Sequence, residues 1–263
     1  MNAPTMLQLT RHADGHVVEM RLNRPEAMNA INTAFSAEIT AATAELAADP
    51  SVRAVVITSV HERAFCVGAD LKERNTFTDA QMMEHRLVSK QAYRGVLDLP
   101  VPAIAAVEGF ALGGGMEIAL SCDLIVAGEQ ATVGLPEVSV GVIPGGGGTQ
   151  LVTRRVGWSR AASMIFTARR MSAAEGKDLG VLDEVVPAGT ARDRALELAT
   201  AIAANSPVGV RNAKKAMRLG MGVDLAAGLE IEDGCWRATA FSGDRAEGVA
   251  AFAEKRTPNW PGH

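Results

Sequence analysis

The chain has 263 residues, of which 48% are hydrophobic and 21% charged, so it has enough apolar material to bury the core of one or two globular domains. Its formal net charge of −4 argues against a general nucleic-acid binder, since such proteins need a basic surface to neutralise phosphates. No apolar stretch near the start is typical of a secretory signal, and the longest one, 110–126, is interrupted by Glu117 and Asp123, so we expect a soluble, cytoplasmic protein.

Strands and helices alternate in the first half of the chain. Residues 17–22 alternate apolar and polar side chains, as a half-buried strand does. Asn32 can cap a helix that ends before Pro50, and 52–58 is a run of β-branched residues typical of a strand buried on both faces. The pattern then predicts a helix over 78–98, a strand over 102–107, a helix over 113–121 and a strand over 123–126. This alternation predicts an α/β fold.

From Trp158 onward the pattern is almost wholly helical. The periodicity predicts helices near 159–168, 190–204, 208–219, 224–240 and 244–254. No low-complexity linker separates the two patterns, so the division is not a flexible hinge. We place the α/β core at 1–200 and a helical C-terminal region at 201–263. Helical tails with apolar faces often pack on neighbouring copies, so we expect the second region to mediate oligomerisation.

The cysteines and histidines indicate neither a disulfide framework nor a metal site. Cys66, Cys122 and Cys235 are odd in number, widely spaced and without a CxxC pair. His61 and Glu62 would begin a zinc-binding HExxH motif only if Phe65 were a histidine. We therefore expect no metal.

Glycine, with 26 residues, concentrates at Gly68, at 113–115 and at 145–148. Such clusters let the backbone approach a ligand closely, and they also serve as simple turn residues. No GxGxxG motif fits them, and GxxxxGK[ST] and GxSxG are both missing. These absences disfavour dinucleotide binding, a P-loop and the commonest serine-hydrolase arrangement.

Two carboxylates stand close to these glycines. Glu117 lies in the apolar segment FALGGGMEIAL, and Glu137 follows a short strand in GLPE. A buried carboxylate has to be hydrogen-bonded or functional. By the pattern alone, however, both are equally typical of residues in the first turn of a helix, where they complement the helix dipole.

The sequence resembles the crotonase (enoyl-CoA hydratase/isomerase) superfamily along nearly its whole length. Six motifs carry the resemblance in the right order: LNRP at 22–25, AFCVGADLK at 64–72, ALGGGME at 111–117, LPE at 135–137, GGGGTQ at 145–150 and AFAEKR at 251–256. The resemblance implies a crotonase-like spiral ββα core with a helical C-terminal trimerisation region, assembled as a homotrimer or a dimer of trimers. It also implies that acyl-CoA thioesters are the substrates, with coenzyme A as part of the substrate and no separate cofactor.

Roles for individual residues also come from the resemblance. The backbone N–H groups of Ala69 and Gly114 match the pair that holds the thioester carbonyl oxygen. Glu117 matches the residue that activates water, and Glu137 the one that protonates C2. Contacts to CoA are implied for Ala27, Ala69, Asp70, Leu71 and Lys72, and for Phe252 and Lys255 from a neighbouring subunit.

The predicted activity is that of an enoyl-CoA hydratase, which adds water reversibly to the 2,3 double bond of 2-enoyl-CoA to give 3-hydroxyacyl-CoA, in fatty-acid or related acyl-CoA metabolism. Having both Glu117 and Glu137 favours a hydratase, because isomerases of the superfamily often keep only the second glutamate. Three alternatives stay open: a Δ3,Δ2-enoyl-CoA isomerase, a dehydratase of the carnitinyl-CoA type, whose EKRxPxW pattern is similar to 254–260, and a non-catalytic acyl-CoA binding protein. The segment after Lys72 could shape an acyl pocket through Phe77, Met82, Met83, Leu87 and Val88, but the helical spacing of its methionines and leucine is more typical of plain core.

Overall fold

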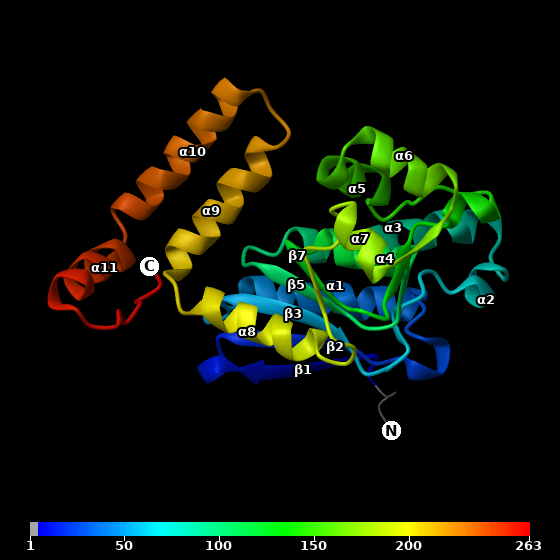
Figure 1. Ribbon diagram of the computed structural model, residues 1–263, viewed down its shortest axis with the longest axis horizontal. Helices are drawn as coiled ribbons and strands as arrows, with labels where there is room; N and C mark the ends of the chain where they lie inside the picture. The colour runs from blue at the N-terminus through cyan, green and yellow to red at the C-terminus, as the bar shows by residue number, and fades with distance from the viewer. Residues whose placement is uncertain (1–4) are drawn as a thin grey trace.

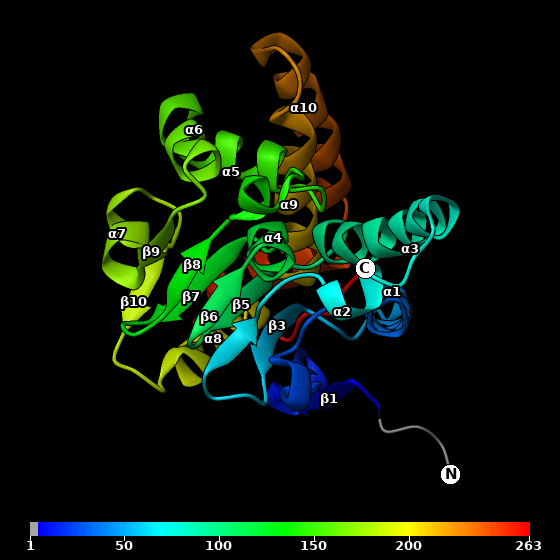
Figure 2. The ribbon, with the colours of Figure 1, turned by 90° about the vertical axis from the view of Figure 1, so that its right-hand side faces the viewer.

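The computed structural model describes residues 5–263, and the chain forms two sheets in that range (Figures 1 and 2). The larger sheet has the strand order β1-β2-β3-β5-β7-β10, with bounds Leu7–His12, Val17–Leu22, Ala54–Ser59, Ala103–Val107, Leu124–Gly128 and Glu184–Val186. The smaller sheet has the order β4-β6-β8-β9, with bounds Ala64–Cys66, Phe110–Leu112, Thr132–Gly134 and Arg170–Ser172. All neighbours pair in parallel except β1 with β2 and β8 with β9.

The chain repeats a unit of two strands and a helix. Three times it passes from the larger sheet to the smaller one, from β3 to β4, from β5 to β6 and from β7 to β8, and a helical segment follows each time. Parallel neighbours need such long crossovers. The segments are α2 (Leu71–Arg74) and α3 (Asp79–Leu97), then α4 (Gly114–Ser121), then the 3-10 turn η3 (Glu137–Val140), α5 (Gly148–Val156) and α6 (Trp158–Phe166). The predicted fold with spiral ββα units is confirmed.

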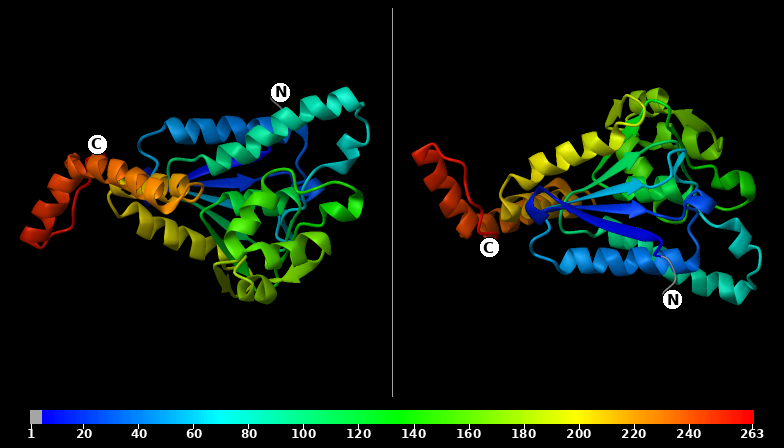
Figure 3. Two further views of the ribbon diagram at one scale, coloured as in Figure 1. Left: turned by 90° about the horizontal axis from the view of Figure 1, so that it is seen from above. Right: turned by 90° about the horizontal axis from the view of Figure 1, so that it is seen from below.

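Helices cover both faces of the larger sheet. Helices α1 (Thr33–Ala48) and α3 lie side by side on one face, and α8 (Ala191–Ala203) lies on the other (Figure 3). Strand β3 serves both layers, because Val55 and Ile57 join the core that includes α1, while Ala54 and Val56 pack against α8. The buried residues of α8 are alanines at every fourth position, which places them on one helical face. The strand predicted over 52–58 is therefore buried on both faces, as expected.

The C-terminal helices extend away from this body (Figures 1 and 3). They are α9 (Pro207–Gly220), α10 (Leu225–Ala240) and α11 (Gly243–Glu254). Helix α9 is attached to the body through Lys214, which donates to the carbonyl of Val101 and pairs with Asp123, both at 2.7 Å. None of the helices between residues 5 and 263 has the length and apolar character that crossing a bilayer requires.

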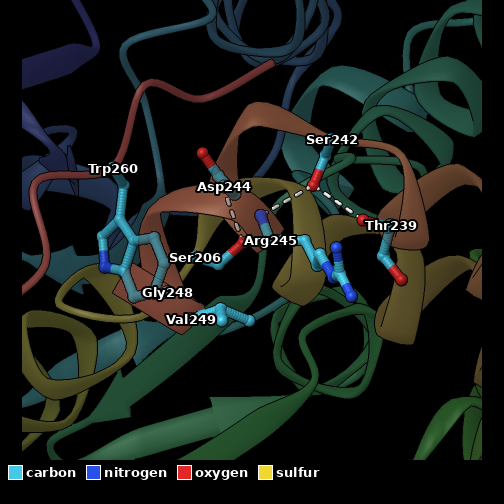
Figure 4. Close-up of a pocket in the computed structure, with 8 residues that line it drawn as sticks. All are labelled: Ser206, Thr239, Ser242, Asp244, Arg245, Gly248, Val249 and Trp260. Atoms are coloured by element: carbon cyan, nitrogen blue, oxygen red, sulfur yellow. Dashed lines mark hydrogen bonds between the residues drawn. The ribbon is translucent and has the colours of Figure 1, made fainter. Parts of the chain in front are cut away.

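A small cavity of about 250 Å³ lies where the end of the chain folds back onto α9 and α11 (Figure 4). Its one buried acidic group, Asp244, accepts hydrogen bonds from the Ser206 hydroxyl at 2.6 Å and from the backbone N–H of Val208 and Gly262. Trp260 lines it and donates to the carbonyl of Ala204 at 2.8 Å. These hydrogen bonds hold the end of the chain in place. Because the polar groups named here are paired with one another, they are not available for a reaction.

The periodicity of the sequence reveals the long elements and misses the short ones. It gives no sign of β1, of the three-residue strands β4, β6, β9 and β10, or of α2, α5 and α7 (Ala173–Asp178). Three residues are too few for an alternating pattern to show. In β1 only Leu7 is buried, so the strand has no apolar face that the sequence could display.

A buried carboxylate ties α8 to the larger sheet. Glu19 of β2 accepts hydrogen bonds from Thr58 at 2.8 Å and from two nitrogens of Arg192 at 2.7 and 2.8 Å, and His12 lies 3.1 Å away. Burial by itself would raise the pKa of Glu19, but the hydrogen bonds and charge of Arg192, with the bond from Thr58, hold it at about 2.

We expect Arg192→Gln to lower the free energy of unfolding at pH 7 by about 2 kcal/mol, below the range for a fully buried pair because the Arg192 side chain is 41% exposed. The folded pKa of Glu19, about 2, lies below its ordinary value of 4.5, so the stabilisation is complete above pH 4.5 and is lost as the pH falls toward 2. Urea unfolding at pH 7 and pH 3 measures this difference. The exposed Arg63, changed to Gln, is the control, and a loss of equal size at both pH values would contradict the account.

Candidate active site

A cavity of about 700 Å³ opens between the first turn of α4, the loop after β4, and η3. Most of its lining is apolar, with a few polar groups that converge on one region, as in many small-molecule sites. The four residues predicted to be catalytic, Ala69, Gly114, Glu117 and Glu137, all line it. The structure therefore brings together residues from three separate motifs.

Two backbone N–H groups are free in this cavity. Gly114 is the first residue of α4, so its N–H has no partner within the helix. Ala69 forms a bridge with Ile31 in which Gly68 accepts and Asp70 donates, so the N–H of Ala69 points the other way. Within residues 5–263 neither amide donates a hydrogen bond. Both are therefore available to one acceptor oxygen.

Gly68 is what lets the two segments approach. Its φ of +97° is unfavourable for other residues, and a Cβ on it would lie 2.9 Å from the carbonyl oxygen of Leu112 and 3.1 Å from the nitrogen of Gly114. The glycine therefore serves both the turn and the close contact between the loop after β4 and the start of α4.

Glu117 is held by the third glycine cluster. Its side chain is 3% exposed, and Oε1 accepts hydrogen bonds from the backbone N–H of Gly146 at 2.6 Å and of Gly148 at 2.8 Å. Burial raises the pKa of Glu117, and the two amide hydrogen bonds offset only part of that effect. Oε2 has no hydrogen-bond partner within residues 5–263, so it can serve a ligand.

Glu137 is partly buried, and its carboxylate has no such support. Both of its carboxylate oxygens lie buried without a hydrogen-bond partner in the described chain. Burial, together with the charge of Glu117, raises the pKa of Glu137 to about 7. Its Oε1 would lie 3.3 Å from a Cβ on Gly113, which places it beside the free amide of Gly114. Near neutral pH it can hold a proton or give one away.

The chemistry open to this arrangement is acid/base catalysis on a substrate whose oxygen gains negative charge. The two amides can stabilise that oxygen, and α4 adds the positive end of its dipole. The two carboxylates can move protons on neighbouring atoms. The pKa of Glu137, about 7, lies in the range that general acids and bases need, and burial raises the pKa of Glu117 as well.

The residues predicted to contact CoA are only partly brought together. Leu71 lines the cavity, whereas Ala27, Asp70 and Lys72 are not part of its lining. Asp70 pairs with Arg24 at 2.7 Å and caps α2 by accepting from the N–H of Lys72 at 3.0 Å and of Glu73 at 3.2 Å. Its evident contribution is to shape the loop that carries Ala69.

Phe252 and Lys255 lie on the far side of the molecule. They stand at the end of α11, which the views place well away from α2 and α4 (Figures 1 and 3). Phe252 is 87% exposed. Contact with a ligand in this cavity would need a second copy of the chain, so their role stays a prediction.

One expectation about the segment after Lys72 needs correction. Met82 and Met83 line the cavity and Met83 is 67% exposed, and Leu87 is exposed too, so the prediction that they are plain core is wrong. The N-terminal half of α3 extends along the cavity wall, and helical spacing does not show which face meets a cavity.

Sequence reasoning also missed polar residues of the wall. Arg74, His85, Arg86 and Tyr93 line the cavity. Tyr93 is the single tyrosine of the chain, and its hydroxyl would lie 2.3 Å from a Cβ on Gly114. No motif contains these residues, because α2 and α3 bring them to the cavity through the fold.

A spiral of ββα units with two free amides facing two buried carboxylates defines an enzyme class of the crotonase type. The family model described as enoyl-CoA hydratase/isomerase matches residues 12–263. The chain therefore belongs to the enoyl-CoA hydratase/isomerase family of the crotonase superfamily, whose members act on acyl-CoA substrates.

Individual relatives agree with this membership. The chain is 40% identical to a protein of Arabidopsis thaliana named probable enoyl-CoA hydratase 2, mitochondrial, covering 99% of this chain and 87% of that one. It is 41% identical to the human enoyl-CoA hydratase domain-containing protein 2, mitochondrial, over 95% of this chain and 87% of that one. The crystal structure of an enoyl-CoA hydratase from Bacillus anthracis matches with a TM-score of 0.95 at 39% identity, covering 98% of this chain and 100% of that chain.

We expect Glu137→Gln to stabilise the fold in a pH-dependent way. The folded pKa of Glu137, about 7, is above its ordinary value of 4.5, so wild type loses stability as the pH rises from 4.5 through about 7. The variant lacks this cost and should exceed wild type by on the order of 2 kcal/mol at pH 8 and by little at pH 4.5. Thermal unfolding at the two pH values tests this, with the exposed Glu129→Gln as control. Parallel stability curves for wild type and Glu137→Gln would refute it.

Proposed function

We propose that the protein is an enoyl-CoA hydratase, which adds water reversibly across the 2,3 double bond of a 2-enoyl-CoA to give the 3-hydroxyacyl-CoA. One observation carries the proposal: Glu117 and Glu137 line the same cavity as the unpaired N–H groups of Ala69 and Gly114. The names of the relatives from Arabidopsis, human and Bacillus anthracis support it.

The thioester oxygen is the natural acceptor for the two free amides. When water adds to C3, electron density moves through C2 to the carbonyl, and the oxygen becomes an enolate. The N–H groups of Ala69 and Gly114 stabilise that charge, and losing one such donor typically costs about 3 to 4 kcal/mol of transition-state stabilisation. Because both donors are backbone groups in tightly packed segments, they need little reorganisation during the reaction.

The two carboxylates divide the proton transfers. Glu117 is fixed through Oε1 by the amides of Gly146 and Gly148, so Oε2 can take a proton from the water as its oxygen bonds to C3. Glu137, whose pKa is about 7, keeps a proton in a large fraction of molecules at neutral pH and gives it to C2. Return of a proton from Glu117 to Glu137, through solvent or product, resets the site for the next turnover.

Hydration changes no oxidation state, so we propose that the reaction needs neither a metal nor a redox cofactor, with CoA entering only as part of the substrate. The contacts proposed for the CoA moiety are those of Ala27, Leu71 and Lys72 in one chain and of Phe252 and Lys255 from another. A cytoplasmic location stays a prediction, since the names of the relatives from Arabidopsis and human include the word "mitochondrial".

We also propose that the C-terminal helices join copies of the chain as a homotrimer or a dimer of trimers. Large apolar side chains on α9, α10 and α11, and at the end of α10, are exposed to solvent, namely Met217, Leu225, Leu229, Trp236, Phe241 and Phe252. Monomeric proteins rarely leave so much apolar surface uncovered. The same assembly brings Phe252 and Lys255 of one copy within reach of the cavity of another.

Replacing either glutamate tests the chemistry. We expect Glu117→Gln and Glu137→Gln each to lower kcat for hydration of crotonyl-CoA by about 10²- to 10⁴-fold, because each removes one proton transfer. Loss of enoyl-thioester absorbance measures the rate, with Glu129→Gln as the matched control. In wild type, kcat/KM for hydration should also fall as the pH rises above about 7, where Glu137 loses its proton.

Full hydratase activity in Glu117→Gln would overturn the assignment of the base. Should crotonyl-CoA not react with wild type, a 3-enoyl-CoA and a 4-hydroxylated thioester would reveal the isomerase or the specialised dehydratase. Tight binding of the thioesters without turnover of any of them would instead indicate an acyl-CoA binding protein.

The assembly has a separate test. We expect the double variant Trp236→Asp and Phe241→Asp to shift the protein from a trimer or hexamer toward smaller species, since Phe241 is 89% exposed and charge would oppose its burial. Light scattering after size-exclusion chromatography gives the mass. Leu9→Asp, on the exposed face of β1, is the control, and a wild-type monomer would refute the proposal.

A further inference from the structure

The wall of the large cavity next to the two glutamates carries positive charge without acidic partners. Arg74 at the end of α2 and Arg86 on α3 both line it, as does His85. Within residues 5–263 neither arginine has a carboxylate oxygen within 4.0 Å. Other arginines of the chain do form such ion pairs, among them Arg11, Arg24, Arg192 and Arg194. Arg86 donates only to the carbonyl of Gly145, at 2.6 Å.

Buried donors at this wall lack acceptors. The Nε of Arg74 is buried without a hydrogen-bond partner in the described chain. His85 is 4% exposed, and its Nδ1 lies 2.9 Å from the Thr33 hydroxyl while its Nε2 is buried and unpartnered. With Thr33 donating to Nδ1, the proton of the neutral ring sits on Nε2. Burying such donors without acceptors is costly, which indicates a ligand that supplies them.

Glu73, the acidic residue next to Arg74 in α2, does not supply the missing acceptor. Burial lowers the pKa of His85, and the charge of Glu73 acts on that pKa in the opposite direction. The Glu73 carboxylate, however, already accepts a hydrogen bond from the backbone N–H of Thr33 at 2.9 Å. Glu117 and Glu137 lie beyond ion-pair distance from Arg74, and the charge of Arg74 is the weakest of the effects on the pKa of each. The guanidinium is therefore near the reaction centre and still free.

The position of Arg74 identifies the part of the substrate it meets. The amides of Ala69 and Gly114 fix the thioester oxygen, so C2 and C3 lie beside the two glutamates. The CoA phosphates lie at the other end of the pantetheine arm, two amide units from the sulfur. Arg86 donates to the carbonyl of Gly145, next to the Gly146 amide that holds Glu117. The wall that Arg86 shares with Arg74 therefore adjoins the glutamates, on the acyl side of the thioester.

We propose that this cavity selects 2-enoyl-CoA substrates whose short acyl chain ends in a carboxylate, which Arg74 binds with His85 and Arg86 beside it. The inference rests on the hydratase function proposed above and narrows its substrate class. A guanidinium suits a carboxylate because its planar N–H groups can donate in pairs. The methylene part of the chain would lie against Met82 and Met83, which adapt to varied ligands.

A substrate pair of equal length isolates the carboxylate. Pent-2-enedioyl-CoA and pent-2-enoyl-CoA have the same chain, and only the first ends in a carboxylate. We expect wild type to favour the diacid by about 30-fold or more in kcat/KM, because the neutral chain leaves the partly buried guanidinium of Arg74 unpaired. Arg74→Met should bring that ratio close to one, Arg74→Lys should restore part of it, and Arg63→Met on the exposed surface should leave it unchanged.

Saturated thioesters test the same contact without chemistry. We expect wild type to bind glutaryl-CoA at least about 10-fold more tightly than pentanoyl-CoA in calorimetry, and Arg74→Met to bind the two alike. If neither enoyl thioester is hydrated, the proposed function fails while this comparison still decides the inference.

Three results would overturn the inference and leave the hydratase function intact. They are hydration of pent-2-enoyl-CoA at least as fast as the diacid, equal binding of the two saturated thioesters by wild type, and an equal loss with both substrates in Arg74→Met. The wild-type comparisons need no variant, so a poorly folded Arg74→Met would not obscure the outcome.

Discussion

The contact between the start of α4 and the end of β4 is the constraint on which the site depends. A Cβ on Gly115 would lie 2.0 Å from the carbonyl oxygen of Cys66, so only glycine lets the helix begin directly against β4. That contact brings the start of α4, with the free N–H of Gly114, beside the loop that carries Ala69. It also buries Glu117 one turn further along the helix. Two donors and one carboxylate thus take their positions from a single backbone approach.

Three glutamates of this chain have buried carboxylates, and the number of hydrogen-bond donors around each decides how far burial raises its pKa. Glu19 is surrounded by donors and has a pKa of about 2, so it stabilises the fold. Glu117 has two amide partners on one oxygen, and burial still raises its pKa. Glu137 has none among the described residues and a pKa of about 7, so it costs stability and gains reactivity. A buried carboxylate without hydrogen-bond donors lowers the stability of the fold, and local exceptions of this kind are typical of functional sites.

Two kinds of feature could be predicted from the sequence: elements with a periodic apolar pattern and sites whose residues form one contiguous motif. The helices α1, α3 and α8 and the buried strand β3 follow from apolar periodicity, and the glycine-rich start of α4 follows from its own residues. That the cluster at 145–148 holds Glu117 could not be predicted, because the two meet only through the fold. The same holds for Arg74, His85 and Tyr93, and helical spacing alone misassigns Met82 and Met83, since it does not distinguish a core face from a cavity wall.

Reaction and selectivity come from different elements of this fold. The amides and carboxylates belong to the loop after β4, to α4 and to η3, which the ββα packing holds rigidly. The cationic wall belongs to α2 and α3, and the outer half of α3 extends past the body, where Met83 and Leu87 are exposed. A substitution at Arg74 therefore changes no contact that positions Glu117, which accepts its hydrogen bonds from Gly146 and Gly148. This separation allows one catalytic frame to serve acyl chains of different chemistry, with the choice made by side chains on its least constrained elements.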